Sequence, residues 1–210
     1  LIINYSHKYI FILSILIVGM LICVEFNNIL LKLSINNILD KNLDVKRFNI
    51  KFLFLNTVTF FYIFFIFCNI SYKIYALDGP TFFLYILSIC FFTDIGGYLF
   101  GKIIGGKKLT KISPKKTLSG SIGSFILSVS PLFFFSNLGY LDLEFNFKNI
   151  LFCLLVSFVS QLGDLFISFL KRKAKIKDTG KILPGHGGLL DRVDGIIFAV
   201  PISFFLLRLI

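Results

Sequence analysis

Long apolar runs alternate with short polar intervals along this chain. Six runs are candidates for membrane helices: 9–31, 52–70, 80–100, 121–139, 149–170 and 195–210. A helix needs about 20 mainly apolar residues to cross a bilayer, so the pattern predicts an all-α integral membrane protein, a polytopic bundle of about six transmembrane helices. The first helix can extend past Glu25 as a tilted or interfacial segment, and the last run is short. No internal repeat or low-complexity linker divides the chain, which predicts one continuous membrane domain.

The polar intervals differ in charge. Three of them, 32–51, 101–120 and 171–194, hold 18 of the 22 Lys and Arg residues, whereas the intervals between them carry few charges. Loops rich in Lys and Arg face the cytoplasm under the positive-inside rule. We therefore expect these three loops on the cytoplasmic side of the membrane and both ends of the chain on the other side.

Composition supports the membrane assignment and narrows the possible partners. The 210 residues are 56% hydrophobic, with a mean hydropathy of +0.86 and a net charge of +11. Because the cations sit at the ends of apolar runs, topology and anionic lipid headgroups explain them better than nucleic acid does. The four cysteines lie in apolar runs without metal-ligand spacing and are expected to be inert. The first run lacks a small-residue cleavage site, so we interpret it as a membrane helix.

Four aspartates are candidates for binding a cation. A carboxylate inside an apolar run, such as Asp164 in VSQLGDLFISFL, costs about 2.5–3.5 kcal/mol, which favours a polar cavity or a bound cation. Asp94, in FFTDIGGYLFG, allows the same role, or its glycines can simply serve helix packing. Asp191 and Asp194 would share one helix face, and with Asp164 they form a predicted magnesium site, since Mg²⁺ prefers oxygen ligands. A charged helix start is the alternative for the Asp191 pair.

Two polar segments suit phosphate groups. In PGHGG, residues 184–188, glycines let backbone N–H groups approach phosphate, and His186 can donate a hydrogen bond or carry a proton. This segment matches neither the P-loop nor the dinucleotide-binding pattern. Within ISPKKTLSG, two cations and two hydroxyls come from Ser113, Lys115, Lys116 and Thr117. These groups suit a triphosphate or a lipid headgroup, although lysines that only set topology would look the same.

The basic segment that ends at Asp194 resembles the signature of the phosphatidate cytidylyltransferase family, also called CDP-diacylglycerol synthases. The matching positions are Ser168, Lys171, Arg172, Lys177, Asp178, Gly180, Pro184, His186, Gly187, Gly188, Asp191, Arg192 and Asp194. Upstream, the Asp94 segment, the SPKKT box at 113–117 and Gly-Asp-Leu at 163–165 follow the same family order. The resemblance covers roughly residues 80–210, which predicts the catalytic core there and N-terminal transmembrane helices in 1–79.

This resemblance implies a membrane enzyme of phospholipid biosynthesis. It would transfer the cytidylyl group of CTP to phosphatidate, giving CDP-diacylglycerol and pyrophosphate, with Mg²⁺ or another divalent cation such as Mn²⁺. Such a transfer depends on positioning and charge neutralisation. The polar site would lie at the cytoplasmic edge of the inner or plasma membrane of a bacterium, among membrane lipids. The chain could assemble as a homodimer, and no nucleic acid partner is expected.

The resemblance also implies roles for individual residues. The expected metal ligands are Asp164, Asp191 and Asp194. Phosphate charge would be neutralised by Lys171, Arg172, Lys177 and Arg192. Asp178 would orient a neighbouring cation, and His186 would contact phosphate or carry a proton. Substrate contacts are expected from Ser113, Lys115, Lys116, Thr117, Gly187 and Gly188.

Two positions depart from the family pattern and keep alternatives open. Ser119 stands where an acidic residue is usual, and Ile167 stands where Glu is usual. Because both changes remove a carboxylate near the expected site, an inactive relative is one alternative. A membrane transferase acting on another lipid phosphate is a second, although the Asp-Gly-x-x-Ala-Arg box of CDP-alcohol phosphotransferases is absent. A transporter that uses Asp94 and Asp164 would need polar residues throughout the membrane depth, whereas here they crowd one face.

The expected metal role of Asp191 can be tested by one substitution. Asp191→Asn is expected to abolish metal-dependent turnover, because the amide removes the negative charge that holds the cation. Membrane insertion should be unaffected, since it depends on the apolar runs. Turnover and membrane-fraction yield measured together check both points, and normal turnover in the variant would contradict the assigned role.

Overall fold

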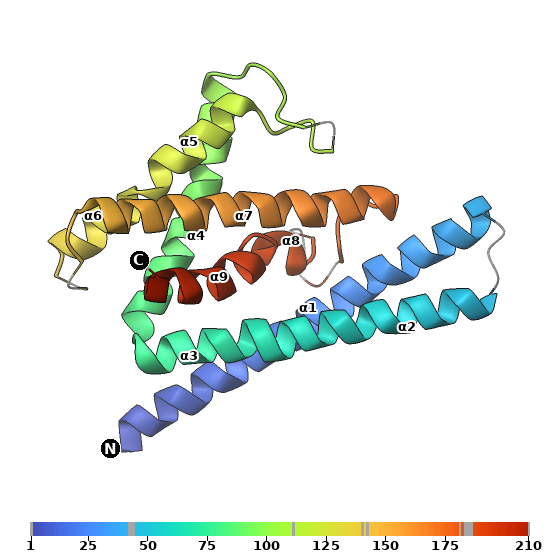
Figure 1. Cartoon of the computed structure of the whole chain (residues 1–210), viewed down its shortest axis with the longest axis horizontal. Coiled ribbons are helices and arrows are strands. Elements are labelled where there is room, and N and C mark those ends of the chain that lie inside the picture. Colours follow the sequence, from blue (N-terminus) through green and yellow to red (C-terminus); the bar gives the residue numbers. More distant parts are fainter. Residues whose placement is uncertain are drawn as a thin grey trace. The chain divides into compact units, whose positions relative to one another are not determined.

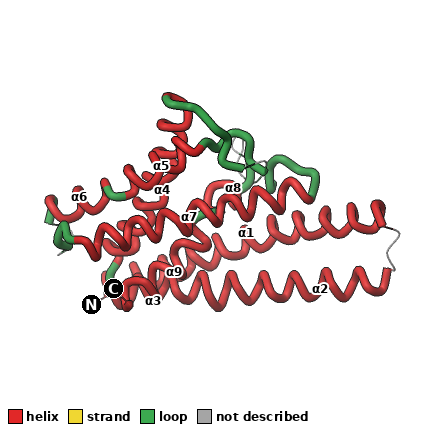
Figure 2. Tube along the Cα trace, turned by 45° about the horizontal axis from the view of Figure 1, so that its top comes forward, coloured by secondary structure: helices red, strands yellow, loops and turns green. Residues whose placement is uncertain are grey.

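The computed structural model describes residues 2–41, 45–110, 112–139, 141, 143–180, 182 and 187–209. In this part of the chain the regular elements are helices, joined by loops and an isolated β-bridge (Figure 2). They are α1 (Ile2–Lys41), α2 (Val45–Phe61), the π-helical segment η1 (Tyr62–Cys68), α3 (Asn69–Leu77), α4 (Pro80–Ile103), α5 (Leu118–Ser128), α6 (Ser130–Asn137), α7 (Phe147–Lys173), α8 (Leu190–Val193) and α9 (Ile196–Leu209).

The chain forms two compact units. The first comprises residues 1–72 and 169–193, and the second comprises residues 73–168 and 194–210. Neither unit is a continuous segment, because the chain crosses between them within α3, within α7 and after α8. The predicted division into N-terminal membrane helices (residues 1–79) and a catalytic core (residues 80–210) is a division by function, and it stays a prediction.

Helix α1 and the α2–η1 segment pack against each other in the first unit (Figure 1). Gly19 permits this approach, because a Cβ atom there would lie 2.8 Å from the sulfur of Cys68. Ile22 and Ile63 are fully or almost fully buried in this unit. The end of α7 and the short helix α8 complete the unit and bring the basic signature segment into it.

Helices α4 and α5 form the most extensive helix contact of the second unit. Helix α4 also packs against α6 and α9. Two prolines lie in the first turns of helices, Pro80 in α4 and Pro131 in α6. Proline lacks an N–H, but an N–H in the first turn would have no acceptor within the helix. The hydroxyl of Tyr85 lies 3.0 Å from the sulfur of Cys153, so a buried hydrogen bond joins α4 to α7.

The structure confirms a polytopic helical membrane protein. Five helices in the described part of the chain are long and apolar enough to cross a membrane: His7–Asn36, Ile50–Leu77, Pro80–Ile103, Leu118–Asn137 and Phe147–Lys173. Large apolar side chains such as Leu13 and Phe91 stay exposed on them, which suits lipid-facing surfaces. The sixth predicted run forms α9, whose 14 residues extend only about 21 Å at the rise of an α-helix.

Glycines bring α4 and α5 into backbone contact. A Cβ atom at Gly96 would collide with the carbonyl group of Gly123, whose carbon would lie 2.8 Å away. The hydroxyl of Ser124 donates to the carbonyl of Thr93 over 2.7 Å, which also joins the two helices. Gly96, which follows Asp94 closely in the sequence, therefore serves close helix packing.

A larger residue at Gly96 should separate these two helices. Gly96→Ala is expected to lower the free energy of unfolding by about 1–3 kcal/mol, because the obstructing atoms are backbone and cannot rotate away. Unfolding of the detergent-solubilised chain measures the change. Ile122→Ala, which truncates a side chain that is 59% exposed on α5, is the control and should have a smaller effect. Equal stability of Gly96→Ala and the unmodified chain would contradict this packing.

Candidate functional site

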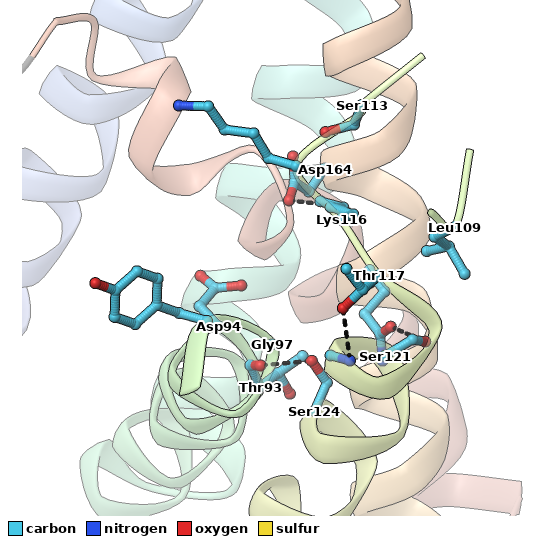
Figure 3. Close-up of a pocket in the computed structure, with 14 residues that line it drawn as sticks. Thr93, Asp94, Gly97, Leu109, Ser113, Lys116, Thr117, Ser121, Ser124 and Asp164 are labelled. Atoms are coloured by element: carbon cyan, nitrogen blue, oxygen red, sulfur yellow. Dashed lines mark hydrogen bonds and ion pairs between the residues drawn. The ribbon is translucent and has the colours of Figure 1, made fainter. Parts of the chain in front are cut away.

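A polar pocket of about 370 Å³ lies in the second unit, between α4, α5, α7 and the loop before α5 (Figure 3). The side chains of the predicted substrate segment line it together with two membrane aspartates: Ser113, Lys115, Lys116, Thr117, Asp94 and Asp164. The pocket thus brings together charged and polar groups of the loop before α5 and two carboxylates from helices that are otherwise largely apolar.

Backbone hydrogen bonds fix the SPKKT segment, residues 113–117, at the start of α5. The N–H of Leu109 donates to the carbonyl of Lys116 over 2.8 Å, next to the β-bridge between Lys108 and Thr117. Thr117 is also the N-cap of α5, since its hydroxyl accepts from the N–H of Gly120 over 3.1 Å. The bridge and the cap therefore determine where the two lysines of the segment lie.

An ion pair joins this segment to α7. The ammonium of Lys116 pairs with the carboxylate of Asp164, and each side chain is 28% exposed (Figure 3). Ser168 donates a further hydrogen bond to Asp164 over 3.2 Å. Asp94, which the sequence left open between binding and packing, lines the same pocket from α4. Two carboxylates and two lysines thus line one partly enclosed polar volume.

The pocket is also lined by polar residues outside the predicted set, among them Ser121 and Gln161. Ser121 donates to the side-chain oxygen of Gln161 over 2.6 Å, which links α5 to α7 beside the pocket. Gln161 precedes Asp164 by three residues, a spacing that places both on one helix face. An amide three residues before a membrane carboxylate is the signal that could have indicated this neighbour.

The structure gives physical roles to the two departures from the family pattern. The hydroxyl of Ser119 donates to the carbonyl of Gly105 and lies 3.0 Å from the hydroxyl of Thr117. Ser119 therefore ties the loop after α4 to the start of α5. Ile167 is fully buried on α7, which suits an apolar side chain better than a carboxylate.

Asp191, in the first unit, lies at the centre of a hydrogen-bond network. Lys171 donates to one carboxylate oxygen over 2.7 Å, and the N–H groups of Thr179 and Gly188 donate to the other over 2.8 and 3.1 Å. Burial alone would raise the pKa of Asp191, but these hydrogen bonds and the Lys171 charge hold its pKa below the usual 3.8. Asp191 therefore fixes the signature segment around a negative charge.

The remaining signature residues differ in exposure. Four of the expected charged residues are exposed at the surface of the first unit: Arg172, Lys177, Asp178 and Arg192. Gly187 has a φ of 87°, which only glycine adopts without strain. Gly188 is buried. His186 and Pro184 lie outside the described residues.

Asp194 belongs to the second unit, as Asp164 does. A Cβ atom at Gly163 would lie 2.9 Å from the carbonyl oxygen of Asp194, so the start of α9 packs directly on α7. Asp191 belongs to the first unit, and no three His, Cys, Asp or Glu side chains gather into a metal-binding group among the described residues. The predicted site of three aspartates would draw on both units and stays a prediction.

Several bacterial proteins are similar to this chain. Phosphatidate cytidylyltransferase of Bacillus subtilis (strain 168) is 40% identical over 132 residues, covering 62% of this chain and 49% of the relative. The enzyme of the same name from Staphylococcus aureus (strain COL) is 44% identical over 133 residues, covering 62% and 50%. That of Helicobacter pylori (strain ATCC 700392 / 26695) is 40% identical over 127 residues, covering 60% and 47%. The chain spans about half the length of these curated relatives.

The family assignment rests on a match along the whole chain. Residues 1–210 match the model described as "Cytidylyltransferase family". The match includes residues 1–79, which lie outside the part of the chain that resembles the family signature. The chain therefore belongs to the cytidylyltransferase family.

Proposed function

We propose that this chain transfers the cytidylyl group of CTP to phosphatidate, forming CDP-diacylglycerol and pyrophosphate for phospholipid biosynthesis. The main observation behind the proposal is the ion pair between Lys116 and Asp164. It joins two elements of the family pattern in one polar pocket of a membrane-spanning unit. Family membership and the names of the bacterial relatives support the same reaction.

The reaction breaks one bond to phosphorus and forms another. An oxygen of the lipid phosphate attacks the α-phosphorus of CTP, and a new P–O bond forms. The bond between the α-phosphorus and the bridging oxygen breaks, and pyrophosphate leaves with the electron pair. No covalent bond to the protein is needed, so the chain contributes positioning and charge neutralisation.

The pocket supplies groups for both tasks. Lys115 and Lys116 would hold phosphate oxygens of CTP or of the lipid headgroup, and Ser113 offers a hydroxyl beside them. In the first unit, Lys171 would neutralise phosphate charge, and its ion pair with Asp191 would hold the ammonium group in place. Further positive charge would come from the exposed residues Arg172, Lys177 and Arg192.

A divalent cation, Mg²⁺ or Mn²⁺, is the proposed cofactor. Asp94 and Asp164 suit Mg²⁺, because it usually takes one or two carboxylates and completes its shell with water and phosphate oxygens. Both line the pocket in which the phosphates would lie. The proposed metal ligands remain Asp164, Asp191 and Asp194, and Asp94 is a further carboxylate beside Asp164 in the pocket. When bound, the ion would neutralise developing charge on the phosphates.

The proposed location is the inner or plasma membrane of a bacterium, with the pocket at the cytoplasmic edge. There CTP arrives from water and phosphatidate from the bilayer. The Lys- and Arg-rich intervals 101–120 and 171–194 support this orientation. Residues 80–210 would form the catalytic core and residues 1–79 the N-terminal membrane helices. A homodimer is a further prediction.

Incorporation of labelled CTP into lipid tests the reaction. We expect the purified, detergent-solubilised chain to form labelled CDP-diacylglycerol from phosphatidate with Mg²⁺, and to release one pyrophosphate per lipid. Asp164→Asn should lower turnover by about 100-fold or more, because it removes a carboxylate from the pocket that the proposal places at the phosphates.

Glu144→Gln is the matched control, since it also neutralises a carboxylate of the second unit but at an exposed loop position. It should leave turnover unchanged. A folded chain that forms no labelled lipid with any divalent metal would refute the reaction. Equal turnover in Asp164→Asn and Glu144→Gln would refute the assigned pocket.

A further inference from the structure

Glu25 is a carboxylate buried inside the first membrane-spanning helix. Its side chain is 1% exposed, and it lies within the apolar span His7–Asn36 of α1. An ionisable group in such a position is costly and marks a functional site by default. The substrate pocket described above does not include Glu25, and the family signature does not contain it.

The partners of Glu25 come from the signature segment, far along the sequence but within the same unit. One carboxylate oxygen accepts from the N–H of Leu189 over 3.0 Å. The other accepts from the N–H of Leu190 over 2.7 Å and from the hydroxyl of Thr179 over 2.9 Å. The first helix thus holds two separate points of the signature segment with one side chain.

Thr179 connects Glu25 to Asp191. Its hydroxyl lies 2.9 Å from an oxygen of Glu25 and 3.0 Å from an oxygen of Asp191, and its N–H donates to that same Asp191 oxygen. A hydroxyl has one proton, so Thr179 can donate to only one of the two carboxylates at a time. The backbone N–H groups satisfy the other. A continuous chain of contacts therefore runs from Glu25 through Thr179 to Asp191 and Lys171.

Two glycines of the signature segment make room for this carboxylate. A Cβ atom at Gly180 would lie 2.5 Å from an oxygen of Glu25, and a Cβ at Gly188 would lie 2.6 Å from the other oxygen and would also collide with Thr179. Neither glycine has a positive φ. Space for Glu25 at Gly180, and for Thr179 and Glu25 at Gly188, accounts for the missing side chains better than backbone conformation does.

We propose that Glu25 is a positioning residue, which sets the geometry of the signature segment so that Asp191 and Lys171 are correctly oriented toward the phosphates. The inference rests on the cytidylyl transfer proposed above and extends the site to the first membrane helix. Glu25 acts through Thr179 and the backbone at 189–190, and it does not contact substrate. Partners that orient a reactive group in this way typically contribute 10- to 100-fold to activity.

Glu25→Gln is the main test, because glutamine keeps the size of the side chain and removes one acceptor oxygen. Each oxygen of Glu25 accepts from a backbone N–H, so either orientation of the amide places its NH₂ group against a donor. We expect kcat to fall about tenfold or more, with KM for CTP and phosphatidate changing less than about threefold. Glu25→Asp keeps two acceptor oxygens and should retain more activity than Glu25→Gln.

A role in packing alone predicts the reverse order, because glutamine matches glutamate in size and aspartate does not. The matched control is Ile29→Val, which trims a fully buried side chain one turn further along α1. It should leave kcat unchanged. The inference would be overturned if Glu25→Gln were more active than Glu25→Asp, or if Ile29→Val lowered kcat equally.

Thr179→Val provides a second variant if the Glu25 variants fold poorly. We expect a similar fall in kcat for this variant alone. Where both single variants fold, the kcat of the double variant with Glu25→Gln should be no lower than that of the less active single variant, because both side chains act in one chain of contacts. Losses that multiply would overturn the linkage through Thr179.

Amide hydrogen exchange gives a readout that does not depend on the reaction. Exchange at Leu189 and Leu190 should be faster in Glu25→Gln than in the unmodified chain, because their N–H groups lose an acceptor. If the unmodified chain forms no CDP-diacylglycerol, the proposed function fails by itself. Faster exchange would then still support the positioning role, and equal exchange would overturn it.

Discussion

A polar side chain within a membrane helix cannot rely on water, so its partner must come from the protein. This constraint shapes both units. In the described part of the chain, no buried side-chain nitrogen or oxygen lacks a hydrogen-bond partner. Asp164 is paired with Lys116, and Glu25 accepts from Thr179 and two backbone N–H groups. Lys116 and Thr179 both lie in loops, so each of these membrane carboxylates also fixes a loop that contains predicted site residues.

Close helix contact is the second condition for this arrangement. A Cβ atom at Gly120 would lie 2.7 Å from the carbonyl oxygen of Gly97, and one at Gly195 would collide with Ser160. Small residues therefore set the separation of α4 from α5, and of α7 from the start of α9. The contact between α4 and α5 borders the pocket, since Gly97 and Gly120 both line it. Larger residues there would move Asp94 away from Lys116.

The sequence predicted the helical membrane fold well, because long apolar runs have few alternatives to a helix in a bilayer. It also selected Lys116 and Asp164, which the structure places in one pocket. It left Asp94 undecided, because glycines beside a carboxylate fit packing and binding equally well. Glu25 appeared only as a position that the first helix can extend past. Its cost is visible in the sequence, but its partners are not, since they lie more than 150 residues away and no local spacing connects them.

Because Glu25 lies against Gly180, the size of side chain that fits at position 180 depends on the residue at position 25. The three atoms nearest to a Cβ atom at residue 180 all belong to the Glu25 side chain. A chain with a shorter residue at position 25 would leave that space open, and residue 180 could then become alanine without strain. Among related sequences, the identity of a residue in the first membrane helix should therefore vary together with a glycine of the signature segment. Two substitutions that are each harmful alone could be tolerated as a pair.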